Sequence, residues 1–167
     1  MSSELRILVD DLVSDLDANP LDMHPQRLEE LARIAPHSIS PLRSPELLEK
    51  YNCVMHAFEL VGKMTEYPHP LRFASTQFVS YLVTRALRPC EPQRDALVTW
   101  SSEGTIKHVG RLIDPVRAES KWGLGILCAH GLDEIPLRYG EVSGFYGAMD
   151  ADSVLEHLRR FIFDKQA

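Results

Sequence analysis

The side-chain pattern of the chain changes near residue 95, and this change limits the folds open to it. Before it, apolar residues recur every three or four positions, as Leu5, Leu8 and Leu12 do, which is the spacing of one helix face. After it, short runs rich in β-branched and aromatic residues, such as residues 96–100, are bounded by turn residues. Helices followed by an antiparallel set of strands indicate an α+β fold.

The same patterns predict the individual elements. The expected helices cover residues 3–17, 25–35, 45–61, 77–87 and 153–162, the last capped by Asp152 or Ser153, and the expected strands cover residues 96–100, 105–113, 119–124 and 139–145. Residues 67–70, with two prolines, are expected to form a turn or an extended loop. We expect residues 1–43 to form an N-terminal helical extension or cap, and residues 44–167 to form the α+β domain.

Charge and hydropathy exclude several classes of protein. The net charge is −6, and the first fifty residues contain ten acidic and five basic residues. No basic stripe is present to neutralise phosphates, so nucleic-acid binding is not expected. No apolar run reaches the ~18 residues of a membrane helix, and the N-terminal residues lack a signal-peptide layout. We therefore expect a cytoplasmic protein, with acidic N-terminal helices that are able to bind a protein partner.

The three cysteines have to be interpreted one by one. Cys53, Cys90 and Cys128 are odd in number and include no C-x-x-C pair, so a disulfide framework is not expected. Asn52 is a good helix N-cap, and a cysteine directly after it would lie in the first helical turn, where free N–H groups favour the thiolate. If a single helix instead ran over residues 45–63, Cys53 would lie within it and gain nothing from a helix end.

A histidine on a strand could serve as the base for this thiol. His108 lies near the start of the second expected strand, from which it could reach a helix end packed on the sheet. The next strand offers a third group to orient the imidazole: Glu119 shares a face with His108 if residue 112 pairs with residue 119, and Ser120 takes that place if the register slips by one residue.

A metal site is the competing interpretation of two of these cysteines. Cys53 with His56, and Cys128 with His130, could together supply four zinc ligands. The two pairs are 72 residues apart, whereas zinc sites usually use closely spaced pairs in short loops. We therefore expect no metal and no cofactor, and we expect Cys128 to fill the core.

The order of several short motifs resembles a bacterial branch of the papain-like cysteine hydrolases, the broad group that includes cell-wall endopeptidases. The motifs are Asn52-Cys53, His108-Val109, Ser120-Lys121-Trp122-Gly123, His130 and Tyr139-Gly140. The resemblance covers roughly residues 50–147, and its specificity lies in the order of the motifs.

The resemblance implies a papain-like α+β domain in which a cysteine-bearing helix packs on a small antiparallel sheet. It implies that Cys53 is the nucleophile and His108 the base of a thiol hydrolase or acyltransferase acting on a peptide, amide or ester bond. Ser120 or Glu119 would orient His108, and Asn52 would lie near the oxyanion beside the backbone N–H of Cys53. The alternative function is a catalytically inactive module that binds a protein partner through its acidic helices.

Overall fold

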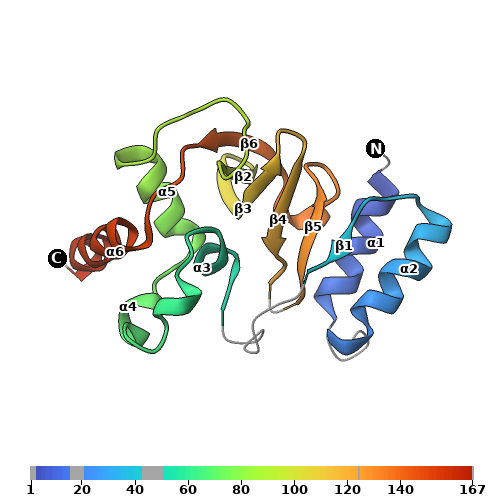
Figure 1. Ribbon diagram of the computed structural model, residues 1–167, viewed down its shortest axis with the longest axis horizontal. Helices are drawn as coiled ribbons and strands as arrows, with labels where there is room; N and C mark the ends of the chain where they lie inside the picture. The colour runs from blue at the N-terminus through green and yellow to red at the C-terminus, as the bar shows by residue number, and fades with distance from the viewer. Residues whose placement is uncertain (1–2, 16–20, 43–50, 124, 167) are drawn as a thin grey trace.

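A computed structural model describes residues 3–15, 21–42, 51–123 and 125–166 (Figure 1). Its helices are α1 (Ser3–Ser14), η1 (Leu21–Met23), α2 (His24–Ile34), α3 (Cys53–Ala57), η3 (Val61–Lys63), α4 (Pro68–Leu71), α5 (Thr76–Arg85), η4 (Leu137–Tyr139) and α6 (Ala151–Gln166), where η marks a 3₁₀ helix. Its strands are β1 (Ser40–Pro41), β2 (Leu97–Ser102), β3 (Thr105–Asp114), β4 (Arg117–Lys121), β5 (Leu127–Gly131) and β6 (Glu141–Tyr146).

The six strands form one antiparallel sheet in the order β1-β5-β4-β3-β2-β6. Strands β2 to β5 follow one another as a meander, and the short β1 adds to the β5 edge. The expected α+β class is therefore confirmed. The sequence patterns did not predict β1 and β5, because β1 has only two residues and β5 is an almost fully buried strand without polar alternation.

Helices cover both faces of the sheet, and each face has its own hydrophobic core. Figure 1 shows α1 and α2 on one side of the sheet and α3 to α6 on the other. Successive residues of β2 illustrate the division, because Leu97 packs with α3, α5 and α6 whereas Val98 packs with α1 and α2. The N-terminal helices thus bury their apolar face against the same sheet that the later helices cover, and the boundary expected near residue 43 stays a prediction.

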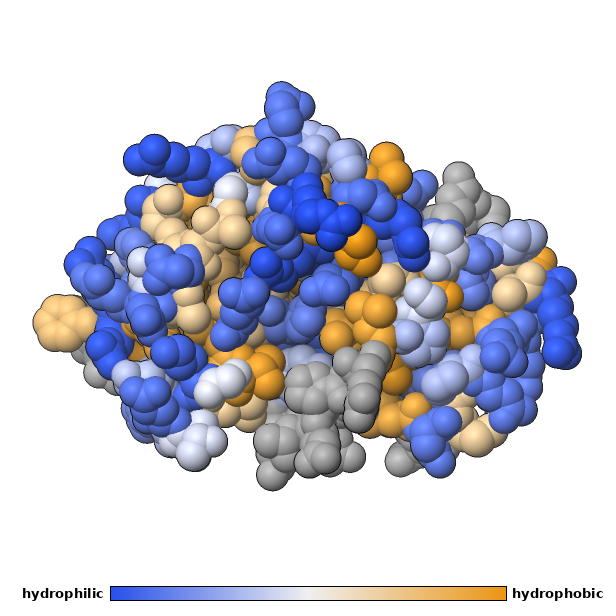
Figure 2. All heavy atoms as spheres, in the orientation of Figure 1, coloured by the Kyte–Doolittle hydropathy of each residue, from blue (hydrophilic) through white to orange (hydrophobic). Residues whose placement is uncertain are grey.

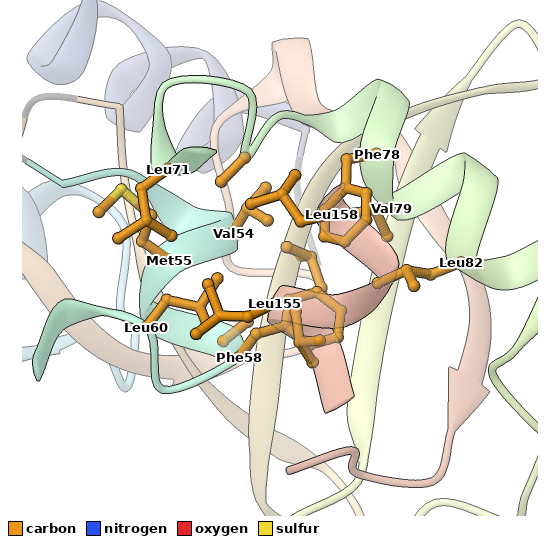
Figure 3. Close-up of a cluster of buried hydrophobic side chains, with 14 of the residues drawn as sticks. Val54, Met55, Phe58, Leu60, Leu71, Phe78, Val79, Leu82, Leu155 and Leu158 are labelled. Atoms are coloured by element: carbon orange, nitrogen blue, oxygen red, sulfur yellow. The ribbon is translucent and has the colours of Figure 1, made fainter. Parts of the chain in front are cut away.

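The first core anchors α3, the element that begins at Cys53. Val54 and Phe58 point from the α3 region toward α5 and α6 side chains, and Met55 lies beside Leu71 of α4 (Figure 3). Val54 and Phe58 are four residues apart and so share a helix face. This burial leaves the face that carries Cys53 and His56 turned toward the sheet.

Two local expectations were wrong. Residues 68–71 form the short helix α4 instead of a loop, with Pro68 in its first turn, where the missing N–H costs nothing. Helix α6 is preceded by Asp150, whose carboxylate accepts hydrogen bonds from the backbone and hydroxyl of Ser153, so neither Asp152 nor Ser153 supplies the cap. The helix expected to begin at residue 45 starts in a segment, residues 43–50, that lies outside the described residues.

The described surface is mixed in character. Figure 2 shows hydrophilic and hydrophobic residues interspersed on one face of the molecule. None of the described helices combines the length and the apolar composition that a membrane crossing requires.

Candidate active site

Asn52 ends the extended chain before α3 and caps the helix. Its backbone is extended, and its side-chain oxygen accepts a hydrogen bond from the Met55 N–H at 3.0 Å. Its side-chain nitrogen donates to the Ala74 carbonyl at 2.7 Å, which ties the cap to the segment before α5. The expected cap is confirmed, and Cys53 is the first helical residue rather than a residue within a longer helix. An oxyanion role for Asn52 stays a prediction and would fall to the second Nδ2 hydrogen.

The Cys53 sulfur lies among backbone N–H groups from two elements. The backbone N–H groups of Val109 in β3 and of Val54 and Cys53 in α3 each lower the pKa of the thiol. Burial has the larger effect and raises the pKa of Cys53 to about 11. The helix start thus lowers the pKa of Cys53, as expected, but burial raises it by more. At neutral pH Cys53 is therefore a thiol rather than a thiolate.

His108 is buried on the face of the sheet that α1 and α2 cover. Its ring stacks on Tyr139, with centroids 4.0 Å apart and planes 3° apart, and lies 5.5 Å from Trp100. Its Nε2 is buried and has no hydrogen-bond partner within the described ranges, the Cys53 thiol included. Burial, and then the nearby His130, hold the pKa of His108 well below its ordinary value, so the imidazole is neutral.

Tyr139 stacks on His108 and interacts electrostatically with Cys53. Burial, and then the negative charge of a Cys53 thiolate, raise the pKa of the Tyr139 hydroxyl. Gly140 follows with φ of 81°, and a Cβ there would lie 2.0 Å from the Ser101 carbonyl oxygen. Only glycine fits this approach, which fixes Tyr139 at the end of η4.

Glu119 does not orient His108. The observed register pairs Arg111 with Glu119 and Leu112 with Ala118, one residue away from the pairing that would place Glu119 on the face of His108. Glu119 instead accepts a hydrogen bond from His56 Nε2 at 3.2 Å. This bond is the main cause of the lowered pKa of Glu119.

Ser120 lies on the same face as His108, but it serves a different histidine. Its hydroxyl is 2.8 Å from His130 Nε2, and Trp122 Nε1 donates to the Ser120 oxygen at 3.1 Å. His130 Nδ1 lies 2.8 Å from the Gly131 carbonyl oxygen. A carbonyl only accepts, so Nδ1 carries the hydrogen and Nε2 accepts from Ser120. The expected third member of a triad is therefore part of a structural network around His130.

The competing zinc site is not formed. His56 is bound to Glu119 and His130 to Ser120. Across the described ranges, no group of three or more His, Cys, Asp or Glu side chains is arranged to hold a metal ion. Cys128 is fully buried and belongs to the second core, as expected of a core residue.

Residues that the sequence patterns had not assigned a role complete the site. Lys121 is fully buried, donates to the Gly123 carbonyl oxygen at 3.0 Å, and interacts electrostatically with Cys53. Lys121 and Tyr139 both lie in motifs of the family resemblance, so the order of the motifs was the signal that could have found them. Their distance from Cys53 along the chain hides the contact from any local pattern.

A comparison with protein families identifies the family of this chain. Residues 43–147 match the family model described as Domain of unknown function (DUF7689). No curated protein and no solved structure matches the chain. The match covers more than half of the chain and includes Cys53, His108, Lys121 and Tyr139, so the chain belongs to this family.

Proposed function

We propose that this member of the DUF7689 family is a thiol hydrolase or acyltransferase of papain-like type that acts on an amide, peptide or ester bond. The observation that carries the proposal is the place of Cys53 as the first residue of α3, behind the Asn52 cap, where the backbone N–H groups of Val109, Val54 and Cys53 favour a negative charge on the sulfur. Donors placed around a reacting sulfur are also donors for the oxyanion that forms next to it.

In the proposed reaction Cys53 attacks the substrate carbonyl carbon, and its proton passes to the His108 imidazole. The two side chains form no hydrogen bond in the resting structure and pack in different cores, so the proposal requires them to approach one another when substrate binds. The S–H bond breaks, a C–S bond forms, and the carbonyl electrons move to the oxygen, which the backbone N–H groups stabilise. When the tetrahedral intermediate collapses, the amine or alcohol leaves with the proton from His108, and a thioester remains on Cys53. Water, or a second amine or alcohol, then releases the acyl group.

The protonation states favour this general-base route over a preformed ion pair. The raised pKa of Cys53 and the lowered pKa of His108 both keep the pair neutral before substrate binds. A neutral imidazole is the form that accepts a proton. The unpartnered Nε2 of His108 supports a chemical role, because a buried polar atom without a hydrogen bond costs about 1–3 kcal/mol of stability.

The proposal is tested by acyl transfer to the protein. The full chain is incubated with p-nitrophenyl acetate at pH 7, and the modified peptide is identified by mass spectrometry before and after hydroxylamine, which cleaves thioesters. We expect a hydroxylamine-sensitive acetyl group on Cys53, lost in Cys53→Ser and retained in Cys90→Ser, since Cys90 is a free, partly accessible thiol outside the site. A wild-type protein in which Cys53 stays unmodified would contradict the proposal and favour the binding-module alternative.

A further inference from the structure

Lys121 is a fully buried lysine whose ammonium group is not paired with a carboxylate of β4. Lysine is almost never fully buried unless it is paired, and its Nζ here lies 3.0 Å from the Gly123 carbonyl oxygen and 5.1 Å from the centre of the Tyr51 ring. Glu119, the one acidic residue of β4, binds His56 instead. Neither a carbonyl nor an aromatic ring supplies the full negative charge that would balance a buried ammonium group.

The packing of α3 on β4 places this ammonium group beside Cys53. The hydrogen bond between His56 and Glu119 fixes how the helix lies along the strand. Lys121 is two residues farther along β4, about 7 Å at the rise of a strand, and it points to the same face. Cys53 is one helical turn from His56, about 5 Å along α3, again on the same face. Lys121 Nζ lies 5.1 Å from the ring centre of Tyr51, two residues before Cys53, so the end of β4 that carries Lys121 lies at the start of α3.

The electrostatics agree with this arrangement. Burial raises the pKa of Cys53, the backbone N–H groups around it lower it, and the positive charge of Lys121 lowers it further by a smaller amount. Reciprocally, the charges of the Cys53 and Cys128 thiolates favour the ammonium form, while burial lowers the pKa of Lys121 to about 8. Of the two residues, Cys53 is partly exposed and Cys128 is fully buried.

We propose that Lys121 is a positioning residue of the thiol site whose ammonium group stabilises the Cys53 thiolate and so sets the pH range in which Cys53 reacts. The inference rests on the proposed function and deepens it. In the first step the S–H proton passes to His108, the electron pair stays on the sulfur, and Lys121 keeps all three of its protons. The negative charge that Lys121 lacks among the described residues of the resting protein thus appears at the moment of reaction.

The test is the pH dependence of iodoacetamide alkylation at Cys53 between pH 6 and 10, read by peptide mass spectrometry on the full chain. Lys121→Met removes the charge and keeps most of the volume. An opposite charge at close range typically shifts a pKa by about one unit or more, so we expect alkylation at pH 8 to be about tenfold slower in this variant. Lys107→Met, an exposed lysine of β3, is the matched control and should leave the profile unchanged.

A purely structural lysine would give a different set of results. It would change the melting temperature and the reactivity of the buried Cys128, but the Cys53 profile would superimpose on that of the wild type, and this outcome would overturn the inference. Lys121→Arg keeps the charge at every pH used, so it should stay within about threefold of the wild type at pH 7. Above pH 9 it should react faster, because Lys121 loses its proton there and arginine does not.

The Arg variant also decides the matter if Lys121→Met fails to fold. An Arg profile that runs parallel to the wild type up to pH 10 would count against the inference. A wild-type Cys53 that is inert at all pH values would instead overturn the proposed function, and the role of Lys121 with it.

Discussion

His108 and His130 are two buried histidines on one face of the sheet, and they differ in what holds them. Both lie within 6 Å of the Trp100 ring centre, at 5.5 and 5.8 Å, and burial lowers the pKa of both. His130 is bonded through both ring nitrogens, to Ser120 and to Gly131. His108 has a buried Nε2 without a partner in the described part of the chain. A satisfied network stabilises a fold, whereas an unsatisfied group costs free energy, so the two residues point to different reasons for being present.

The largest effect on stability is expected at His130. His130→Ala leaves a cavity beside Trp122 and removes the partner of the Ser120 hydroxyl and of the Gly131 carbonyl. Cavity formation and lost buried hydrogen bonds together give a loss of about 3–4 kcal/mol in the free energy of unfolding. Urea denaturation at pH 7 measures it, and a loss below about 1 kcal/mol would remove the basis for treating His130 as structural.

Acid should destabilise the protein through the same two histidines. The pKa of His130 is lowered to about 4 in the folded state, from an ordinary value near 6.5. Stability from the neutral ring is therefore complete above about pH 6.5 and is lost as the pH falls toward 4, by about 1.4 kcal/mol per pH unit. His130 alone should contribute about 2–3 kcal/mol to the difference between urea denaturation at pH 7 and at pH 4.5. The total difference should be smaller in His108→Phe, which removes the second titrating ring.

Ser120→Ala distinguishes the role of His130 from that of His108. The change removes the hydroxyl that donates to His130 and accepts from Trp122, so about 1–2 kcal/mol of stability should be lost. Acetylation of Cys53 should stay within about threefold of the wild type, because Ser120 does not serve His108. A much larger loss of acetylation, without unfolding, would restore Ser120 as the residue that orients the base.

The smallest effect on stability is expected at His108. His108→Phe keeps an aromatic ring on Tyr139 and removes a buried polar atom that lacks a partner. The free energy of unfolding should change by no more than about 1 kcal/mol, and a gain is as compatible with the account as a small loss. Thermal and urea denaturation measure this change. Destabilisation as large as that of His130→Ala would show that both histidines stabilise the fold and would contradict the difference proposed between them.

The sequence predicts the parts of this fold whose signals are local. Short stretches of chain predict these elements. Helical periodicity predicts α1 and α2, β-branched runs predict β2 and β3, and Asn52 predicts the cap of α3. The strand register was not predicted, because a slip of one residue exchanges Glu119 for Ser120 without changing any local pattern. Strand β5 was not predicted either, because a buried strand lacks the alternation of apolar and polar residues that marks a strand with one buried face.

In the candidate site too, local signals predict some features and tertiary packing determines the others. Cys53 and His108 were singled out from their neighbours and from the order of the motifs. The direction of the pKa shift of Cys53 was not predicted, because it depends on how deeply tertiary packing buries the sulfur rather than on the helix end alone. Lys121 and His56 acquire their settings from the packing of α3 on β4, which no spacing in the sequence specifies.

The most direct test of the account compares acyl transfer to Cys53 in the wild type and in His108→Phe at pH 7. The rate of hydroxylamine-sensitive acetylation by p-nitrophenyl acetate is followed on the Cys53 peptide, with the acetylation of Cys90 as the internal reference. If His108 takes the proton from Cys53, the rate at Cys53 falls by about 100-fold or more in the variant while Cys90 is unaffected. Rates within threefold of each other would contradict the assignment of His108 as the base.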